Sequence, residues 1–139
     1  GSYRGYIWSL VIQEFKDLPF INKIIGIGCD SLKPFLSAGH YEEMVSTTGF
    51  TYDNAHNEFL QYLITTGVFG LAMYLAALWA GIKEGVRKLK EQQSEPTLIA
   101  LFGVIGYLIQ SMVNINQCVT TPIFVILFAI MTLKNKEKN

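Results

Sequence analysis

A long apolar run over residues 60–82 is the dominant feature of the hydrophobic pattern. It contains no charged side chain, and its few polar ones lie near its beginning. As a helix, such a run rises roughly 34 Å, which is enough to cross a hydrocarbon core of about 30 Å. The pattern therefore predicts a transmembrane helix over 60–82. Gly67 and Gly70 lie on one face of it, where another helix can approach closely.

Two further apolar runs follow in the last third of the chain. Residues 98–109 are apolar apart from glycines and Tyr107, and the run continues with polar residues to 117. The third run ends at 133 and spans roughly 22 Å as a helix, which is short for a crossing. We predict transmembrane helices at about 98–117 and 120–133. The polar residues between them either line a polar cavity at membrane depth or form a solvated turn. These residues are Gln110, Asn114, Asn116, Gln117, Thr120 and Thr121.

The basic residues indicate which helix ends face the cytoplasm. Four of them lie within residues 83–90 and three more follow residue 133, whereas only four occur in residues 1–58. Because Lys and Arg concentrate on the cytoplasmic side of membrane helices, this pattern predicts a cytoplasmic loop over 83–96. It places residues 1–58 on the outer side of the membrane, ahead of a membrane part over 59–139.

The residues before the first apolar run contain one stretch with helical spacing. Apolar side chains recur from Ile7 to Phe15, and Pro19 then prevents the helix from continuing. The stretch is too short and too polar to span a bilayer. It is typical of an amphipathic helix at the membrane interface, with Tyr6 and Trp8 near the headgroups. A core helix of a soluble domain is the alternative.

Residues 18–52 have the composition of a long loop, with several glycines, two prolines and many hydroxyl side chains. Such a long irregular segment is unusual unless it is functional. Gly26-Ile27-Gly28 is too incomplete for a phosphate-binding loop, because neither the third glycine of that motif nor a following Gly-Lys pair is present. We interpret these glycines as turn-formers.

Composition supports the membrane interpretation. Charged residues make up 16% of the chain, against roughly 25% in soluble proteins. The mean hydropathy is +0.30, and the zero net charge offers no basic field for nucleic acid. The predicted fold class is all-α. It is an integral membrane protein with three transmembrane helices, preceded by an extracytoplasmic loop with a short amphipathic helix.

Candidate chemistry lies on the outer side, at Arg4 and in the polar segment 51–62 that leads into the first transmembrane helix. The fork of Arg4 suits a phosphate or diphosphate group, and His56 can take a proton from a hydroxyl. A histidine at a helix start is also a common surface or capping residue. Asp53 or Asn54 is expected to cap the helix. Tyr52 can stack on a sugar ring or pack the loop. His40 could join His56, but two histidines without a third ligand make a poor zinc site.

Several of these residues carry a resemblance to a known family. His56-Asn57-Glu58-Phe59-Leu60, followed by Gly67 and Gly70, resembles the "HN..L......G..G" signature of the O-antigen ligase and O-antigen or capsule polysaccharide polymerase superfamily. Arg4 with Ile7-Trp8, then Pro19 and Gly26-Ile27-Gly28, is similar to the "R..IW…P..G.G" segment of that family. Gln110-Ser111 before a proline-started span also fits. The resemblance covers the whole chain and corresponds to the C-terminal part of the family.

The resemblance implies a glycosyltransferase of the bacterial cytoplasmic membrane. Its donor is a glycan linked to undecaprenyl diphosphate, its acceptor is a hydroxyl of a glycan or glycolipid on the outer face, and it uses no cofactor and no metal. Carried over by position, Arg4 holds the diphosphate leaving group and His56 orients or deprotonates the acceptor hydroxyl. Arg4, Asn57 and Tyr52 are the expected substrate-binding residues. Ligase and polymerase both remain open. Because family members have more helices and further arginines, the chain is expected to be a fragment that is inactive alone.

Two other functions are alternatives. A fragment of a membrane solute transporter would place polar residues at mid-membrane, where residues 60–82 have almost none, so the enzyme is favoured. A soluble helical domain without catalysis is the third interpretation. Extraction by salt without detergent would support that interpretation and contradict both membrane functions.

Overall fold

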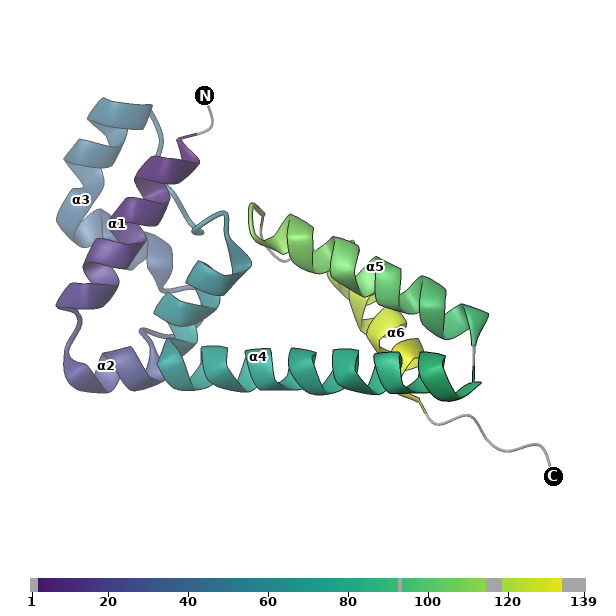
Figure 1. Cartoon of the computed structure of the whole chain (residues 1–139). Helices are drawn as coiled ribbons and strands as arrows, with labels where there is room; N and C mark the ends of the chain where they lie inside the picture. The colour runs from purple at the N-terminus through teal and green to yellow at the C-terminus, as the bar shows by residue number, and fades with distance from the viewer. Residues whose placement is uncertain (1–2, 93, 115–118, 134–139) are drawn as a thin grey trace. The chain divides into compact units, whose positions relative to one another are not determined.

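The computed structural model describes residues 3–92, 94–114 and 119–133, and these residues form an all-helical structure without strands. They fall into two compact units, one of residues 3–73 with 111–114, and one of residues 74–92, 94–110 and 119–133. The fourth helix of the chain contributes to both units. The helices, labelled in Figure 1, are α1 (Arg4–Asp17), α2 (Phe20–Ile25), α3 (Leu32–Thr48), α4 (Glu58–Gln92), α5 (Glu95–Ser111) and α6 (Thr120–Thr132).

Helix α1 is a core helix of the first unit. The helix predicted near residues 6–15 is confirmed, and its apolar stripe of Ile7, Leu10 and Val11 is buried. These side chains share one hydrophobic core with residues of α3 and with Ile64 of α4. The apolar face that predicted an interfacial helix therefore packs against protein.

The long irregular loop predicted over residues 18–52 is wrong, because α2 and α3 occupy most of it. Helix α3 buries Leu32, Leu36 and Met44 on the face toward α1, and this burial outweighs the loop-like composition. Pro34 lies in the first helical turn, where its missing N–H costs nothing. Gly49, at φ 78°, ends the helix in the left-handed conformation typical of a helix terminus.

Helix α4 begins at Glu58 and is broken at Gly67, whose φ of 72° and ψ of −176° lie outside the helical region. The continuous helix predicted over residues 60–82 is therefore two helical segments, and the second runs on to Gln92. Residues 83–92, predicted in a loop, are helical; the cytoplasmic location of this segment stays a prediction. Among the described residues, α4 alone is long and apolar enough to cross a membrane, and α5 and α6 are shorter apolar helices.

A backbone junction fills the break in α4. Because the helix breaks at Gly67, the carbonyls of Ile64 and Thr65 cannot accept the usual hydrogen bonds from the N–H groups four residues later. The N–H of Ile27 donates to the carbonyl of Ile64 at 3.0 Å, and the N–H of Gly28 donates to that of Thr65 at 2.9 Å. The segment after α2 thus satisfies two carbonyls that the break would otherwise leave unpaired.

Glycine is needed on both sides of this junction. A Cβ atom on Gly26 would lie 2.2 Å from the carbonyl carbon of Thr65, and one on Gly67 would lie 2.2 Å from the carbonyl oxygen of Ile24. Both contacts are with backbone, which cannot rotate away. The close approach of another helix predicted at Gly67 is made by the end of α2, while Gly70 contacts Thr66 of α4.

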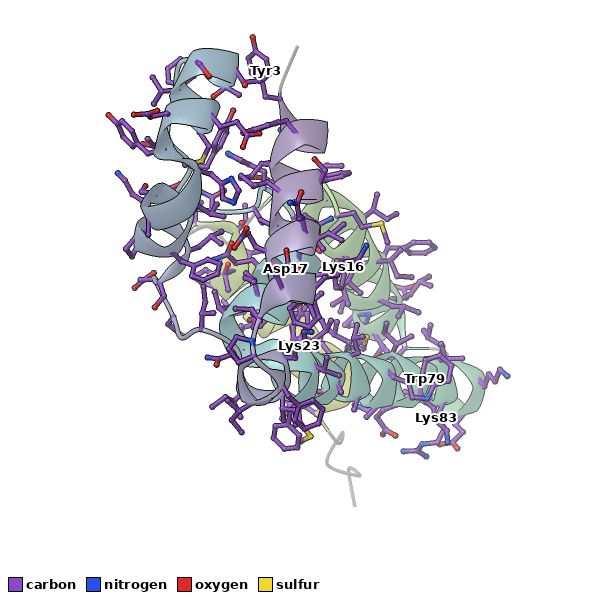
Figure 2. The ribbon with its side chains drawn as sticks, turned by 90° about the vertical axis from the view of Figure 1, so that its left-hand side faces the viewer. Tyr3, Lys16, Asp17, Lys23, Trp79 and Lys83 are labelled. Atoms are coloured by element: carbon purple, nitrogen blue, oxygen red, sulfur yellow. The ribbon has the colours of Figure 1, made fainter. Side chains whose placement is uncertain are left out.

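The second unit consists of the later part of α4 with α5 and α6. Ala100, Leu101 and Val104 of α5 and Met131 of α6 form its buried core. Gly85 allows close packing, since a Cβ there would lie 2.4 Å from the Cγ atom of Met131. Most of the other apolar side chains of these helices point outward, and Trp79 of α4, visible in Figure 2, is 71% exposed. The predicted end of one span at residue 117 lies outside the described residues.

Candidate functional site

The segment that leads into α4 forms a tight turn that presents His56. This residue has a φ of 49°, in the left-handed region that non-glycine residues rarely adopt. Its N–H donates to the Oδ1 atom of Asn54 at 3.1 Å, which closes the turn. Such a conformation costs on the order of 1–3 kcal/mol and persists only where the surrounding structure holds it.

Asn57 holds this turn against two other parts of the first unit. Its Oδ1 atom accepts the N–H of Leu60 at 3.0 Å, so Asn57 is the residue that caps α4. The cap predicted at Asp53 or Asn54 is wrong because the helix starts later, at Glu58. The Nδ2 atom of Asn57 donates to the carbonyl of Met112, at 2.8 Å, in the segment after α5.

The turn also folds back onto the first segment of α4. The N–H of Ala55, which is fully buried, donates to the Oε1 atom of Gln61 at 2.9 Å. Tyr52 packs on the hydrophobic core and meets the ring of His56 edge-on, with centroids 6.2 Å apart and planes at 87°. His56 remains half-buried, so part of this residue stays accessible.

Arg4 is the first residue of α1, and it is exposed. Within residues 3–92, 94–114 and 119–133, its side chain makes no hydrogen bond or ion pair, so the guanidinium is available to a ligand. The structure places Arg4 in the same unit as Tyr52, His56 and Asn57, but no described interaction joins it to them. Of the four predicted site residues, the structure brings Tyr52, His56 and Asn57 together in the turn before α4.

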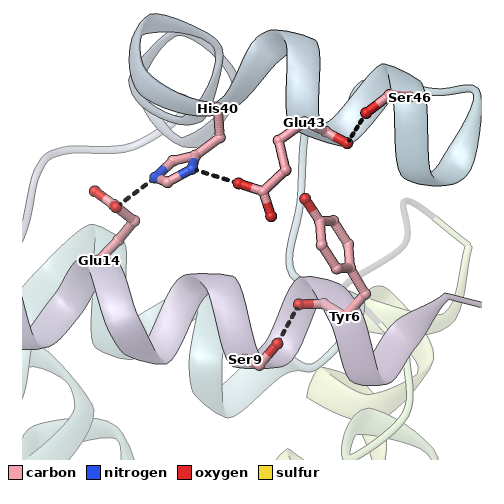
Figure 3. Close-up of polar contacts among 6 residues, drawn as sticks. All are labelled: Tyr6, Ser9, Glu14, His40, Glu43 and Ser46. Atoms are coloured by element: carbon pink, nitrogen blue, oxygen red, sulfur yellow. Dashed lines mark hydrogen bonds and ion pairs between the residues drawn. The ribbon is translucent and has the colours of Figure 1, made fainter.

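A second polar cluster, which the sequence analysis missed, joins α1 to α3 (Figure 3). The Nε2 atom of His40 lies 2.7 Å from the Oε1 atom of Glu14, and its Nδ1 atom lies 3.1 Å from the Oε2 atom of Glu43. The contact with Glu14, followed by the contact with Glu43, raises the pKa of His40 above 6.5. A protonated His40 donates to both carboxylates and clamps the two helices. It therefore does not join His56 in a zinc site.

The hydroxyl of Tyr6 is buried beside this cluster and points toward Glu43 (Figure 3). Among the described residues, this hydroxyl has no hydrogen-bond partner. Burial, and then the nearby Glu43 carboxylate, raise the pKa of Tyr6 above its usual value of 10.0. The sequence hides this cluster because the loop-like composition of residues 18–52 conceals the helical spacing of His40 and Glu43.

The described residues contain no group of three or more His, Cys, Asp or Glu side chains arranged to hold a metal ion. Cys29 is exposed and its thiol is free. The chemistry that the described site offers is therefore that of an imidazole, a guanidinium, an amide and a phenol.

The first half of the chain matches a known protein family. A family model described as O-antigen ligase matches residues 1–75, which is more than half of the chain. The match includes Arg4, both junction glycines and the turn at His56, whereas residues 76–139 lie outside it. No curated protein and no solved structure matches the chain.

Proposed function

The chain belongs to the O-antigen ligase family, a family of bacterial membrane proteins with glycosyltransferase-like activity, and on this premise we propose that it is part of a membrane glycosyltransferase. The proposed reaction moves a glycan from undecaprenyl diphosphate to a hydroxyl of an acceptor glycan or glycolipid. It takes place at the outer face of the bacterial cytoplasmic membrane and serves the synthesis of lipopolysaccharide or a related polysaccharide.

In this reaction the acceptor oxygen attacks the anomeric carbon of the donor glycan. A new glycosidic bond forms while the bond from that carbon to the diphosphate oxygen breaks, and undecaprenyl diphosphate leaves. His56 takes the proton of the acceptor hydroxyl, as a general base does. Arg4 binds the diphosphate through its fork of N–H groups and stabilises the charge that develops on it.

The observation that carries the proposal is the conformation of His56. A left-handed backbone at a non-glycine residue is strained, and such strain is concentrated at functional sites. Three contacts maintain it, through Asn54, Asn57 and Gln61. A residue that only caps a helix requires neither the left-handed conformation nor these contacts. The cap of α4 is Asn57, not His56.

Asn57 and Tyr52 complete the proposed site. One N–H and one lone pair of the Asn57 amide remain after its contacts with Met112 and Leu60, so it can still bind a substrate hydroxyl. The ring of Tyr52, edge-on to that of His56, offers an apolar wall against which a sugar can pack.

The break in α4 raises the transporter alternative again, because discontinuous helices in transporters use free carbonyls to bind ions. The carbonyls of Ile64 and Thr65 already accept hydrogen bonds from Ile27 and Gly28. These carbonyls are therefore not free to bind an ion. The family match also favours the transferase.

Two substitutions at one position test this function in the full-length protein. His56→Ala removes the imidazole, and His56→Asn removes it while keeping a side chain that tolerates the left-handed conformation. We expect both to lower glycan transfer by about 10²–10⁴-fold, the share of a general base, with unchanged abundance in the membrane. Normal length and yield of the glycan product in the asparagine variant would refute the catalytic role of His56.

A further inference from the structure

Helix α2 exposes its apolar side chains and partly buries its polar ones, which is the reverse of a helix on a water-exposed surface. Its apolar residues Phe20, Ile21 and Ile25 are 79%, 58% and 59% exposed, and none of its residues is fully buried. Its two polar residues, Asn22 and Lys23, are half-buried. A cluster of large apolar side chains on one exposed turn marks an interaction surface.

The end of α2 is attached at the point where α4 resumes after its break. Two hydrogen bonds from Ile27 and Gly28 attach the end of α2 to the first segment of α4. The carbonyl of Ile24 lies against Gly67, and the next residues of α4, Val68 and Phe69, are 53% and 63% exposed. Exposed apolar side chains of both elements therefore flank one backbone junction.

Charged groups border this apolar surface on the side of α1. Lys16 and Asp17 end α1, and Lys23 lies on α2 just beyond them (Figure 2). Lysine side chains at the edge of an apolar surface can reach lipid phosphates while their stems stay among apolar groups. This order of charged and apolar residues matches that of a lipid leaflet.

We propose that α2 is the element of this unit that lies in the membrane interface, with Phe20, Ile21 and Ile25 among phospholipid acyl chains. The occupant of the surface is the lipid leaflet that α4 enters, because the two apolar surfaces meet at the Gly67 junction. Helix α1, whose apolar stripe is buried in the protein core, does not have this role. The anchor sets the depth of the unit that carries His56, and so the distance of the site from the lipid phosphates.

The inference rests on the membrane placement of α4 that is part of the proposed function, and one experiment separates the two. Single cysteines replace Ile21 and Ile25 on α2, Phe69 on α4, and Tyr41 on α3, in the full-length protein with its native cysteines changed to serine. All four positions are exposed, so a label does not disturb the core. Each variant carries a nitroxide in vesicles of phosphatidylethanolamine and phosphatidylglycerol, and collisions with oxygen and with a water-soluble nickel chelate are measured.

At positions 21, 25 and 69 we expect oxygen collisions to exceed nickel collisions several-fold, and at position 41 we expect the reverse. Nickel access at 21 and 25 with lipid exposure at 69 would overturn the proposal for α2 alone. Nickel access at 69 as well would overturn the membrane placement of α4 and this inference with it. Protection of 21 and 25 from both reagents would show a protein partner, which also overturns the proposal.

Discussion

Gly67→Ala is the substitution for which the structure makes the sharpest prediction. Gly67 has a φ of 72° and a ψ of −176°, a combination that is essentially restricted to glycine. The new Cβ atom would lie 2.2 Å from the carbonyl oxygen of Ile24 and 2.7 Å from the backbone nitrogen of Gly26. Both neighbours are backbone atoms of the junction, so relief requires the segment after α2 to move away from α4.

Three effects set the size of the loss. The strained backbone costs on the order of 1–3 kcal/mol in alanine. Overpacking of a well-packed contact costs typically about 1–3 kcal/mol. Separation of the two segments weakens the hydrogen bonds to the carbonyls of Ile64 and Thr65, at about 0.5–1.5 kcal/mol each. Together these contributions come to roughly 3–9 kcal/mol, a large part of the roughly 5–15 kcal/mol by which native domains are stable.

The measurement is the thermal unfolding midpoint of the full-length protein in detergent. At about 2–4 °C per kcal/mol for a protein of 150–250 residues, the midpoint should fall by about 6 °C or more. Gly26→Ala breaks the same junction from the other side and should behave alike. Gly5→Ala is the matched control, because a Cβ there would meet nothing within 4 Å and alanine favours a helix.

The result that would refute the reasoning is a Gly67→Ala protein with the midpoint and glycan product of the parent. The break in α4 would then not depend on glycine. A double variant of both junction glycines should lose less than the two single losses added together, because the first substitution already opens the junction. Full additivity would show that the two glycines act independently.

Three further substitutions test the site. Arg4→Lys keeps the charge but loses the bidentate fork, so transfer should fall roughly tenfold or more at unchanged membrane abundance; parental activity would make Arg4 structural. Asn57→Ala should lower the transfer rate, and it should lower the unfolding free energy by roughly 0.5–2 kcal/mol because the cap is lost. Asn57→Ser can still cap the helix and should recover most of the stability. Equal losses of stability in the two variants would contradict the capping role. Because Glu14 and Glu43 raise the pKa of His40 above 6.5, its contribution to stability is complete below about that pH and is lost as the pH rises through the raised pKa. The unfolding midpoint of the parent should therefore fall with rising pH relative to His40→Gln, and parallel profiles would exclude the clamp.

Much of the candidate site was predictable from the local pattern and the family motifs together. The polar segment before the long apolar run singled out His56, and the family resemblance added Asn57 and Tyr52; the structure brings these three together. The role of the asparagine as the cap was not predictable, because Asp53 and Asn54 are equally good capping residues by type. Only the path of the backbone decides where the helix begins.

The cluster around His40 shows why other contacts escaped prediction. Its partner Glu14 lies 26 residues away in the sequence, and the pair forms only because α3 packs on α1. Glycines and hydroxyl residues gave that segment the composition of a loop. Burial of Leu32, Leu36 and Met44 against α1 made it a helix instead, since most helical stability in proteins comes from tertiary packing rather than from propensity.

The sequence by itself determined the helical class, the helix near the N-terminus and the long apolar segment of α4, because hydrophobic periodicity is a local property. It also carried the family motifs, which lie in order along the chain and need no structure to be recognised. Only the tertiary structure decided that α4 breaks at Gly67 and that Gly26 meets it there. A glycine becomes obligatory because backbone from another part of the chain approaches it closely. The residues next to it in the sequence do not reveal that approach.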